Sequence, residues 1–253
     1  MRPSCFAASQ EGAKVSESNF PVSERNRVRR LYERGSYDHE SVFKILDCAL
    51  LCHVAYVLDG QPHCTPTMFW RENEVLYWHG SSASRMLRHL KGGMPACLTV
   101  SHLDGLVLAR SGFHHSVNYR SAMCFGTARI VDDPDLKARA LADVVNRFYP
   151  GRADTLRPNH PQEIKSVTVI RMPIEQASAK VRAKNVVDDE EDYALPIWAG
   201  VIPVNSLIGG EEPCPRLVKG MTRPPNLAFY SEGRKLEEAL RETQRAYDCE
   251  PAE

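Results

Sequence analysis

The sequence has no excess of either charge, because 32 lysine and arginine residues balance 32 aspartate and glutamate residues in a chain of 253. A balanced chain has no overall field that would draw it to nucleic acid or to an anionic membrane. Any phosphate group that it binds must be held by a local cluster of donors. We therefore expect neither nucleic acid nor a membrane among its partners.

Long apolar runs are also missing. Nowhere do about eighteen apolar residues follow one another, so the sequence predicts no membrane-spanning helix. Residues 1–16 contain one early arginine and no apolar core of the kind that a secretory signal peptide needs. These two absences lead us to expect a cytoplasmic protein.

The eight cysteines form no CxxC pair, which is the spacing typical of structural zinc sites. Cys97 and Cys124 stand in apolar runs, where cysteine acts as a small hydrophobic residue in a reducing compartment. Cys48 and Cys52 lie four residues apart before His53, but no second pair follows them. We expect no metal site.

Composition divides the chain into three segments. Residues 1–36 are polar and end in a basic stretch, which is typical of a flexible arm. Residues 37–204 hold most of the periodic apolar segments and form the expected globular domain. Residues 205–253 are rich in proline, glycine and charge, and we interpret them as a tail that is flexible or packs on that domain. A helix is expected at 236–247, but it has too few apolar residues for a core helix.

Short strands dominate the central domain. Helices are predicted after Asp38, from Ser82 and from Pro134, because each begins with a capping or first-turn residue and continues at helical spacing. Strand patterns occupy residues 53–58, 64–70, 75–79, 96–101, 106–110, 119–131, 167–172 and 177–181. Many short strands with few helices favour a closed antiparallel barrel over a parallel α/β sheet.

Two polar stretches interrupt the apolar pattern. The first, Tyr77-Trp78-His79-Gly80-Ser81-Ser82-Ala83-Ser84-Arg85, joins a strand to a helix start, where backbone N–H groups and hydroxyls can hold a phosphate. An ordinary serine cap on a surface helix explains the same residues equally well. The second runs from Ala109 to Ser121 and is too polar to bury without partners. A ligand, a second subunit or a surface hairpin would each account for it.

The motifs, taken together and in order, resemble the flavin-nucleotide-binding branch of the pyridoxamine 5′-phosphate oxidase-like superfamily. The resemblance rests on Tyr37-Asp38, Thr65-Pro66-Thr67, His79-Gly80-Ser81, Ser84-Arg85-Met86, Phe113-His114-His115-Ser116, Asn118-Tyr119-Arg120-Ser121, Ser178-Ala179-Lys180-Val181-Arg182 and Tyr193-Ala194-Leu195-Pro196-Ile197-Trp198-Ala199-Gly200. It implies a mainly β protein with a six-stranded antiparallel split β-barrel, which forms a homodimer and holds FMN in grooves between the subunits.

The resemblance also implies residue roles. The segment Thr65, Pro66, Thr67 and Met68 would run along the flavin, and its phosphate would be held by His79, Gly80, Ser81, Ser84 and Arg85. Tyr119, Arg120 and Ser121 would approach the isoalloxazine edge, and Trp198 would reach the flavin of the partner subunit. Family enzymes that oxidise pyridoxamine phosphate carry a C-terminal Arg-x-His arrangement that is missing here, so the closer resemblance is to nitroimidazole-resistance relatives.

These roles predict an FMN-dependent oxidoreductase that acts on a small organic substrate, with His114 and His79 as candidate proton relays because histidine titrates near neutral pH. A structural role for either histidine is an equally good interpretation. Two alternatives are a non-catalytic flavin sensor and a haem-binding relative with an axial histidine. Since neither tail has a core-quality stretch, deletion of residues 1–25 and 206–253 is expected to leave the flavin bound.

Overall fold

The computed structural model describes residues 19–81, 90 and 92–249 and consists mainly of antiparallel strands with a few helices. The predicted helix from Ser82 falls on residues outside the described ranges. The strands are β1 (Gly35–Ser36), β2 (Leu51–Leu58), β3 (Gln61–Glu72), β4 (Val75–Ser81), β5 (Met94–Leu108), β6 (Ser116–Ile130), β7 (Val167–Pro173), β8 (Gln176–Arg182) and β9 (Gly200–Pro203). The mainly antiparallel β class predicted from the sequence is confirmed.

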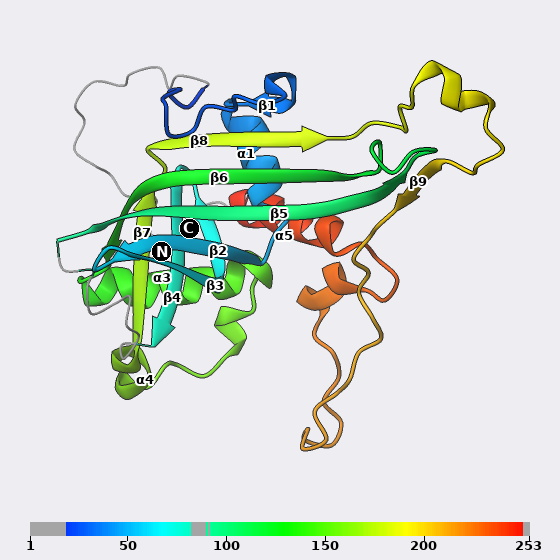
Figure 1. Ribbon diagram of the computed structural model, residues 1–253. Helices are drawn as coiled ribbons and strands as arrows, with labels where there is room; N and C mark the ends of the chain where they lie inside the picture. Colours follow the sequence, from blue (N-terminus) through cyan, green and yellow to red (C-terminus); the bar gives the residue numbers. More distant parts are fainter. Residues whose placement is uncertain (1–18, 82–89, 91, 250–253) are drawn as a thin grey trace.

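Six of these strands pair with one another in a ring. β5 pairs with β6, β6 with β7, β7 with β4, β4 with β3, β3 with β2, and β2 again with β5. β1 and β8 extend the sheet beyond β6, and β9 extends it along the outer half of β5 (Figure 1).

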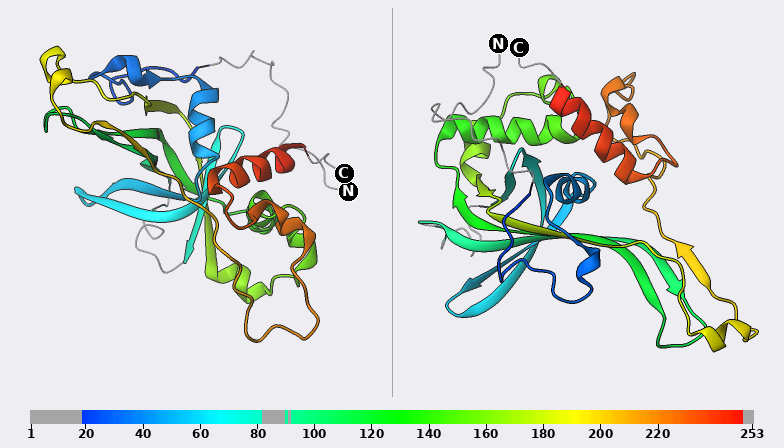
Figure 2. Two further views of the ribbon diagram at one scale, coloured as in Figure 1. Left: turned by 90° about the vertical axis from the view of Figure 1, so that its right-hand side faces the viewer. Right: turned by 90° about the horizontal axis from the view of Figure 1, so that it is seen from above.

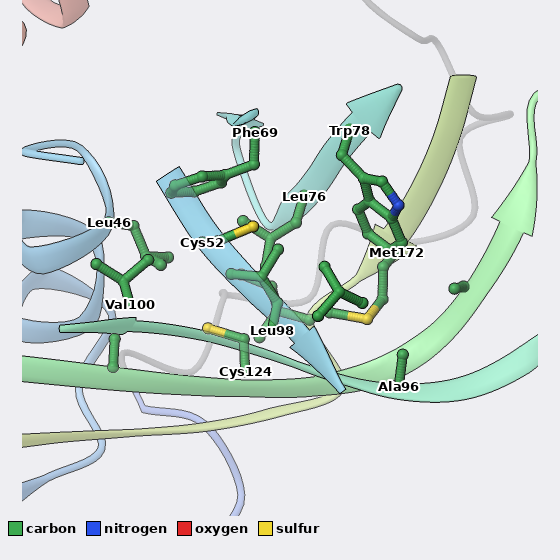
Figure 3. Close-up of a cluster of buried hydrophobic side chains, with 14 of the residues drawn as sticks. Leu46, Cys52, Phe69, Leu76, Trp78, Ala96, Leu98, Val100, Cys124 and Met172 are labelled. Carbon is green, nitrogen blue, oxygen red and sulfur yellow. The ribbon is translucent and has the colours of Figure 1, made fainter. Parts of the chain in front are cut away.

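The ring encloses the main hydrophobic core. In β2, buried residues alternate with more exposed ones, as expected for a strand with one face inside. Cys52, Leu98 and Cys124 contribute inward side chains from three neighbouring strands, and Figure 3 shows them packed together. Helix α1 (His39–Leu46) packs on this core through Val42 and Leu46. The capping prediction is confirmed, because the Asp38 side chain accepts a hydrogen bond from the backbone N–H of Ser41.

Two helices cover the outer side of β3, β4 and β7, namely α3 (Pro134–Phe148) and α5 (Leu236–Cys249) (Figure 2). A second cluster forms there, in which Trp70, Tyr77 and Val169 of the strands meet Phe148 and Leu240 of the helices. Short helices connect the remaining segments: η1 (Tyr32–Arg34), η2 (Ala153–Thr155), α4 (Pro161–Ser166), η3 (Glu190–Ala194) and η4 (Pro225–Tyr230). In the described part of the chain, no helix has both the length and the apolar character that crossing a membrane requires.

The C-terminal helix differs from the sequence prediction. The helix is present, but its Ala239 and Leu240 are fully buried rather than peripheral. The helix has few apolar residues, and hydrogen bonds also hold it in place: the buried Arg147 donates to Thr243 Oγ1 at 3.2 Å. The 205–253 segment therefore ends in a packed core element.

The N-terminal segment also packs earlier than expected. Phe20 is buried, and its backbone N–H donates to the Tyr37 carbonyl at 2.9 Å. Asn26 is buried as well and donates to the carbonyl of Ala177 in β8. The predicted flexible arm therefore does not extend to residue 36, because the chain is packed from about Phe20 onward.

The strand predictions missed one feature of β5. Segments 96–101 and 106–110 were expected as two strands, but residues 94–108 form one strand with a register shift between Leu103 and Gly105. Together with β6 this strand forms a long hairpin that extends from the body of the molecule and carries β9 and η3 near its end (Figure 1). The intervening polar residues interrupt the sequence pattern, not the strand.

Candidate functional site

The predicted flavin segment of β3 splits between two faces. Pro66 lies opposite His53 of β2, and Met68 lies opposite Leu51, so these side chains share the outer face of the sheet. Thr65 points to the other face, where its Oγ1 is 3.2 Å from the Tyr56 hydroxyl.

The predicted residues of β6 alternate in the same way. Tyr119 and Ser121 share the outer face, whereas Arg120 lies on the opposite side of the strand. Arg120 donates two hydrogen bonds to Asp104, at 2.9 and 2.7 Å, and a third to Glu237 of α5 at 2.7 Å. These bonds, first those to Asp104, raise the pKa of Arg120 even though burial opposes the rise. The structure therefore pairs Arg120 with two carboxylates instead of leaving it on the outer face.

The two outer-face groups lie on one surface but are separated by β2 and β5. Pro66 pairs with His53, His53 with Thr99, and Thr99 with Met123. Neighbouring strands are about 4.8 Å apart, so β3 and β6 are about 14 Å apart on this surface. The outer faces of β2 and β5 therefore lie between Pro66 and Ser121.

The strand end at His79 carries a buried polar atom that no described residue binds. His79 lies opposite Val169, Gly80 opposite Thr168 and Ser81 opposite Val167. The His79 Nδ1 is buried and has no hydrogen-bond partner among residues 19–81, 90 and 92–249, and burial lowers the pKa of this histidine, which keeps it neutral at pH 7. A buried nitrogen without a partner is unusual and is consistent with a ligand-binding role. Ser84 and Arg85, the other predicted phosphate ligands, lie outside the described residues.

The two candidate catalytic histidines lie far apart within one chain. His79 is near the β4–β7 end of the barrel, whereas His114 is in the turn between β5 and β6, where its Nε2 lies 3.3 Å from the Asp189 carboxylate. The fifteen-residue strand β6 separates the two ends, which corresponds to about 45 Å along the strand. They cannot act on one substrate within one subunit.

Trp198 lies on the protruding hairpin and is 66% exposed. Its indole packs on Gly200, where an added Cβ would come within 2.8 Å of the ring. Trp198 is therefore not a core residue of its own subunit. Its predicted contact with a partner's flavin stays a prediction.

A cavity of about 720 Å³ was not anticipated from the sequence. It lies between β5, the start of β2, and two C-terminal stretches, 204–206 and 235–237; we call it the seam cavity. Its lining includes His102, Asp104, Arg120, Lys235 and Glu237. Two residues could have indicated it: Asp104 and Arg120 are charged residues within long strands, and such residues need partners when they are partly buried.

Comparison with known proteins defines the family. The sequence model of the pyridoxamine 5′-phosphate oxidase family matches residues 38–181, which is more than half of the chain. No curated protein matches.

Solved structures match over a larger part of the chain. The structure of the flavocytochrome Anf3 from Azotobacter vinelandii has 43% sequence identity and a TM-score of 0.78, and the match covers 83% of this chain and 98% of that one. The FAD and haem binding protein from Mycobacterium smegmatis has 35% identity and a TM-score of 0.75, over 80% and 98% of the two chains.

A third solved structure, described in connection with nitroimidazole resistance, matches a shorter part of the chain. A Bacteroides thetaiotaomicron protein described as a 5-nitroimidazole antibiotic resistance protein has 27% identity and a TM-score of 0.50, over 58% of this chain and 86% of that one. The residues that carried the resemblance in the sequence, the ring of antiparallel strands and the family match agree, and the chain belongs to the pyridoxamine 5′-phosphate oxidase family.

Proposed function

We propose that this protein is a flavocytochrome, which binds one flavin nucleotide and one haem per chain and carries out electron transfer. The observation that carries the proposal is the near-complete match to two solved structures whose descriptions name a flavocytochrome and an FAD and haem binding protein. The match to each covers 98% of that chain and is not confined to the segment shared across the family.

The residues of this chain fit a flavin. Pro66, Tyr119 and Ser121 share one outer face, and the buried His79 Nδ1 offers a polar atom at the strand end that has no partner among the described residues. A bound flavin exchanges one or two electrons, and a bound haem iron exchanges one, so a protein holding both can link two-electron and one-electron chemistry. Neutral His79 would hold the flavin by a hydrogen bond rather than by charge.

The flavin that we propose is FAD, because the Mycobacterium smegmatis protein is described as binding FAD. FMN is the prediction from the family resemblance, and the same experiment distinguishes the two. The absorption spectrum of the purified protein is recorded first. The protein is then heated to release its ligands, which are identified by mass. Flavin and haem in equal amounts are expected; protein that takes up flavin but no haem, even after haemin is added, would contradict the flavocytochrome proposal.

We also propose that two copies associate through the outer face of β2, β5 and β6. Leu51 is 66% exposed there, and Val57, Leu103 and Met123 are exposed as well. An exposed apolar surface of this kind marks an interface. A homodimer would cover it and place the flavin-facing residues of β3 and β6 between subunits, as the family resemblance predicts.

A further inference from the structure

Arg182, at the end of β8, is a buried cation without a counter-charge. The residue is 8% exposed, and its guanidinium forms no ion pair with residues 19–81, 90 or 92–249. Its Nη1 donates to the side-chain oxygen of Asn118 at 2.6 Å, which is a neutral acceptor. Burial of a charge is costly unless an opposite charge accompanies it. Arg182 therefore lacks an anionic partner in the part of the chain that the structure describes.

A second arginine lies next to Arg182 and adds to the positive charge. Arg34, the last residue of η1, is partly buried, and its Nε has no hydrogen-bond partner among the described residues. The Glu33 carboxylate is 3.8 Å from this nitrogen, which is beyond hydrogen-bonding distance. Burial lowers the pKa of Arg182, and the charge of Arg34 lowers it further. Two guanidinium groups thus lie close enough to repel each other.

A lysine extends this group of cations along β8. Residues two apart on a strand point to the same side, so Lys180 and Arg182 lie on one face of β8. The residues opposite them on β6 are Ser121 and Tyr119. The Lys180 Nζ donates to a backbone carbonyl at 3.3 Å and forms no ion pair with a described residue. We call Arg34, Lys180 and Arg182 the cationic cluster.

The N-terminal segment packs beside the cationic cluster but does not neutralise it. Val28 packs on Gly35, where an added Cβ would lie 2.9 Å from the Val28 Cβ, and Gly35 pairs with Lys180. In Figure 1 this segment lies along β8. The acidic residues of the neighbourhood already form ion pairs: Glu24 with Arg27 and Arg29, and Glu175 with Arg25.

The cationic cluster lies far from the predicted phosphate end of the flavin site within one subunit. His79 pairs with Val169, and the next residue of β7, Ile170, pairs with Ile130 of β6. Tyr119, which is opposite Arg182, is separated from Ile130 by most of β6, or about 36 Å along the strand. The cluster and His79 therefore serve different chemical groups of that subunit.

We propose that the cationic cluster binds the carboxylate or phosphate group of a small organic molecule. The oxygens of either group accept paired, charge-assisted hydrogen bonds from guanidinium groups, and their negative charge offsets the repulsion between Arg34 and Arg182. Tyr119 and Ser121, beside the cluster, are the residues predicted at the flavin edge. The molecule is therefore the substrate that exchanges electrons with the flavin, and this role rests on the proposed function.

The test uses the full chain as purified with its cofactors. Calorimetry at constant ionic strength measures the binding of inorganic phosphate and of succinate to wild type, Arg182→Gln and Arg34→Gln. We expect wild type to bind at least one of these probes, and the tighter one distinguishes a phosphate from a carboxylate ligand. Each substitution should weaken that binding about tenfold or more and leave the flavin content unchanged.

The stability of Arg182→Gln without a probe separates ligand binding from a structural role. Glutamine can still donate to Asn118, and the substitution removes a buried charge that has no counter-charge. The melting temperature of Arg182→Gln should therefore be no lower than that of wild type. A fall of several degrees would show that Arg182 stabilises the fold and would contradict the proposal.

Arg29→Gln is the matched control, because Arg29 belongs to the same basic segment but is exposed and paired with Glu24. It should bind the probes as wild type does. Wild-type protein that binds neither probe at millimolar concentration would overturn the proposal. Loss of flavin from Arg182→Gln would also overturn it, since the anion would then be the phosphate of the cofactor, as would a monomeric Arg182→Gln, since a second copy would then supply the counter-charge.

The substrate role has its own measurement. Saturation of the flavin-loaded protein with the bound probe should shift the flavin absorption spectrum, and an unchanged spectrum would reject this role. Purified protein that holds neither flavin nor haem, but binds the probe through Arg182, would reject the proposed function and leave the anion site in place. The two failures are thereby distinguished.

Discussion

The ring of strands has two outer faces that differ in burial. We call the β3–β4–β7 side, which lies under helices, the covered face, and the β2–β5–β6 side, which is exposed, the bare face. On the β3–β4–β7 side, Trp70 and Tyr77 are buried beneath α3 and α5. On the β2–β5–β6 side, Leu51, Val57 and Met123 remain exposed, although their strands alternate in the same way. Burial of apolar surface is favourable wherever it occurs, at about 25 cal/mol per Å². The chain itself supplies the cover on one face, and we propose that a second copy supplies it on the other.

The covered face should depend most strongly on the C-terminal segment. Deletion of residues 206–253 removes Leu240 from the second cluster and Glu237 from Arg120, and it opens the seam cavity. Loss of one buried leucine side chain costs about 2–5 kcal/mol, so removal of the whole helix should leave little stability. We expect aggregation or a fall in melting temperature of more than ten degrees, measured by calorimetry.

Deletion of residues 1–18 serves as the comparison for this truncation, because it removes a segment of the predicted arm that precedes the buried Phe20. Its melting temperature should stay near that of the intact chain. A protein lacking residues 206–253 that melts like the intact chain and stays coloured would restore the original expectation that this tail is dispensable.

Dimer formation through the bare face should be sensitive to an added charge rather than to the loss of a buried side chain. Met123 lies between Thr99 and Ser178 on this surface, so Met123→Arg would place a cation in the proposed dimer interface. Burying an unpaired charge is costly, and the expected result is a monomer by sedimentation with reduced flavin content.

Leu156→Arg introduces the same charge at a similarly exposed leucine near η2, outside this surface. It should leave the assembly unchanged. A Met123→Arg protein that remains dimeric with full flavin would show that the bare face is not the interface.

Much of this contrast was accessible from the sequence, and part of it was not. Alternation and capping predicted the strands and the helix after Asp38, because local chemistry specifies both. The burial of α5 was missed because Leu240 is one of few apolar residues there, and its partners lie some ninety residues earlier in the chain around Arg147. The ion pair of Arg120 with Glu237 was missed for the same reason, since Glu237 is distant in sequence and no local pattern links the two.

The ion pair between Arg120 and Glu237 predicts a moderate dependence of stability on pH. Burial alone would raise the pKa of Glu237, but the hydrogen bond and charge of Arg120 lower it overall. A carboxylate whose pKa is lowered on folding stabilises the protein above its unfolded value of about 4.3, and that contribution is lost as the pH falls through the folded value. Glu237→Gln should therefore cost about 1 kcal/mol at pH 7 and lose less stability below about pH 4 than wild type does.

Urea melts of both proteins at pH 7 and pH 3.5 measure this difference. Glu242 on the same helix pairs with Arg234 at the surface, so Glu242→Gln is the control and should have little effect on stability. Equal stability losses on acidification in wild type and Glu237→Gln would show that this pair does not hold α5 in place.

The smallest effect on stability is expected at Trp198, where the comparison of covered and bare surfaces is sharpest. The indole is two-thirds exposed in one subunit and packs on Gly200 at the end of the hairpin. Replacing an exposed residue changes stability by about 0.5 kcal/mol or less, so Trp198→Ala should melt within about two degrees of wild type and remain a dimer.

The fluorescence of the bound flavin should change more clearly. If the partner's flavin lies beneath the Trp198 indole, removal of the indole takes away an aromatic neighbour that quenches flavin emission, and the bound flavin should fluoresce more strongly. Phe113→Ala changes an aromatic residue on the same hairpin that is 90% exposed, and its emission should match wild type. Unchanged flavin fluorescence in Trp198→Ala would place the tryptophan away from any flavin and leave it as part of the bare surface alone.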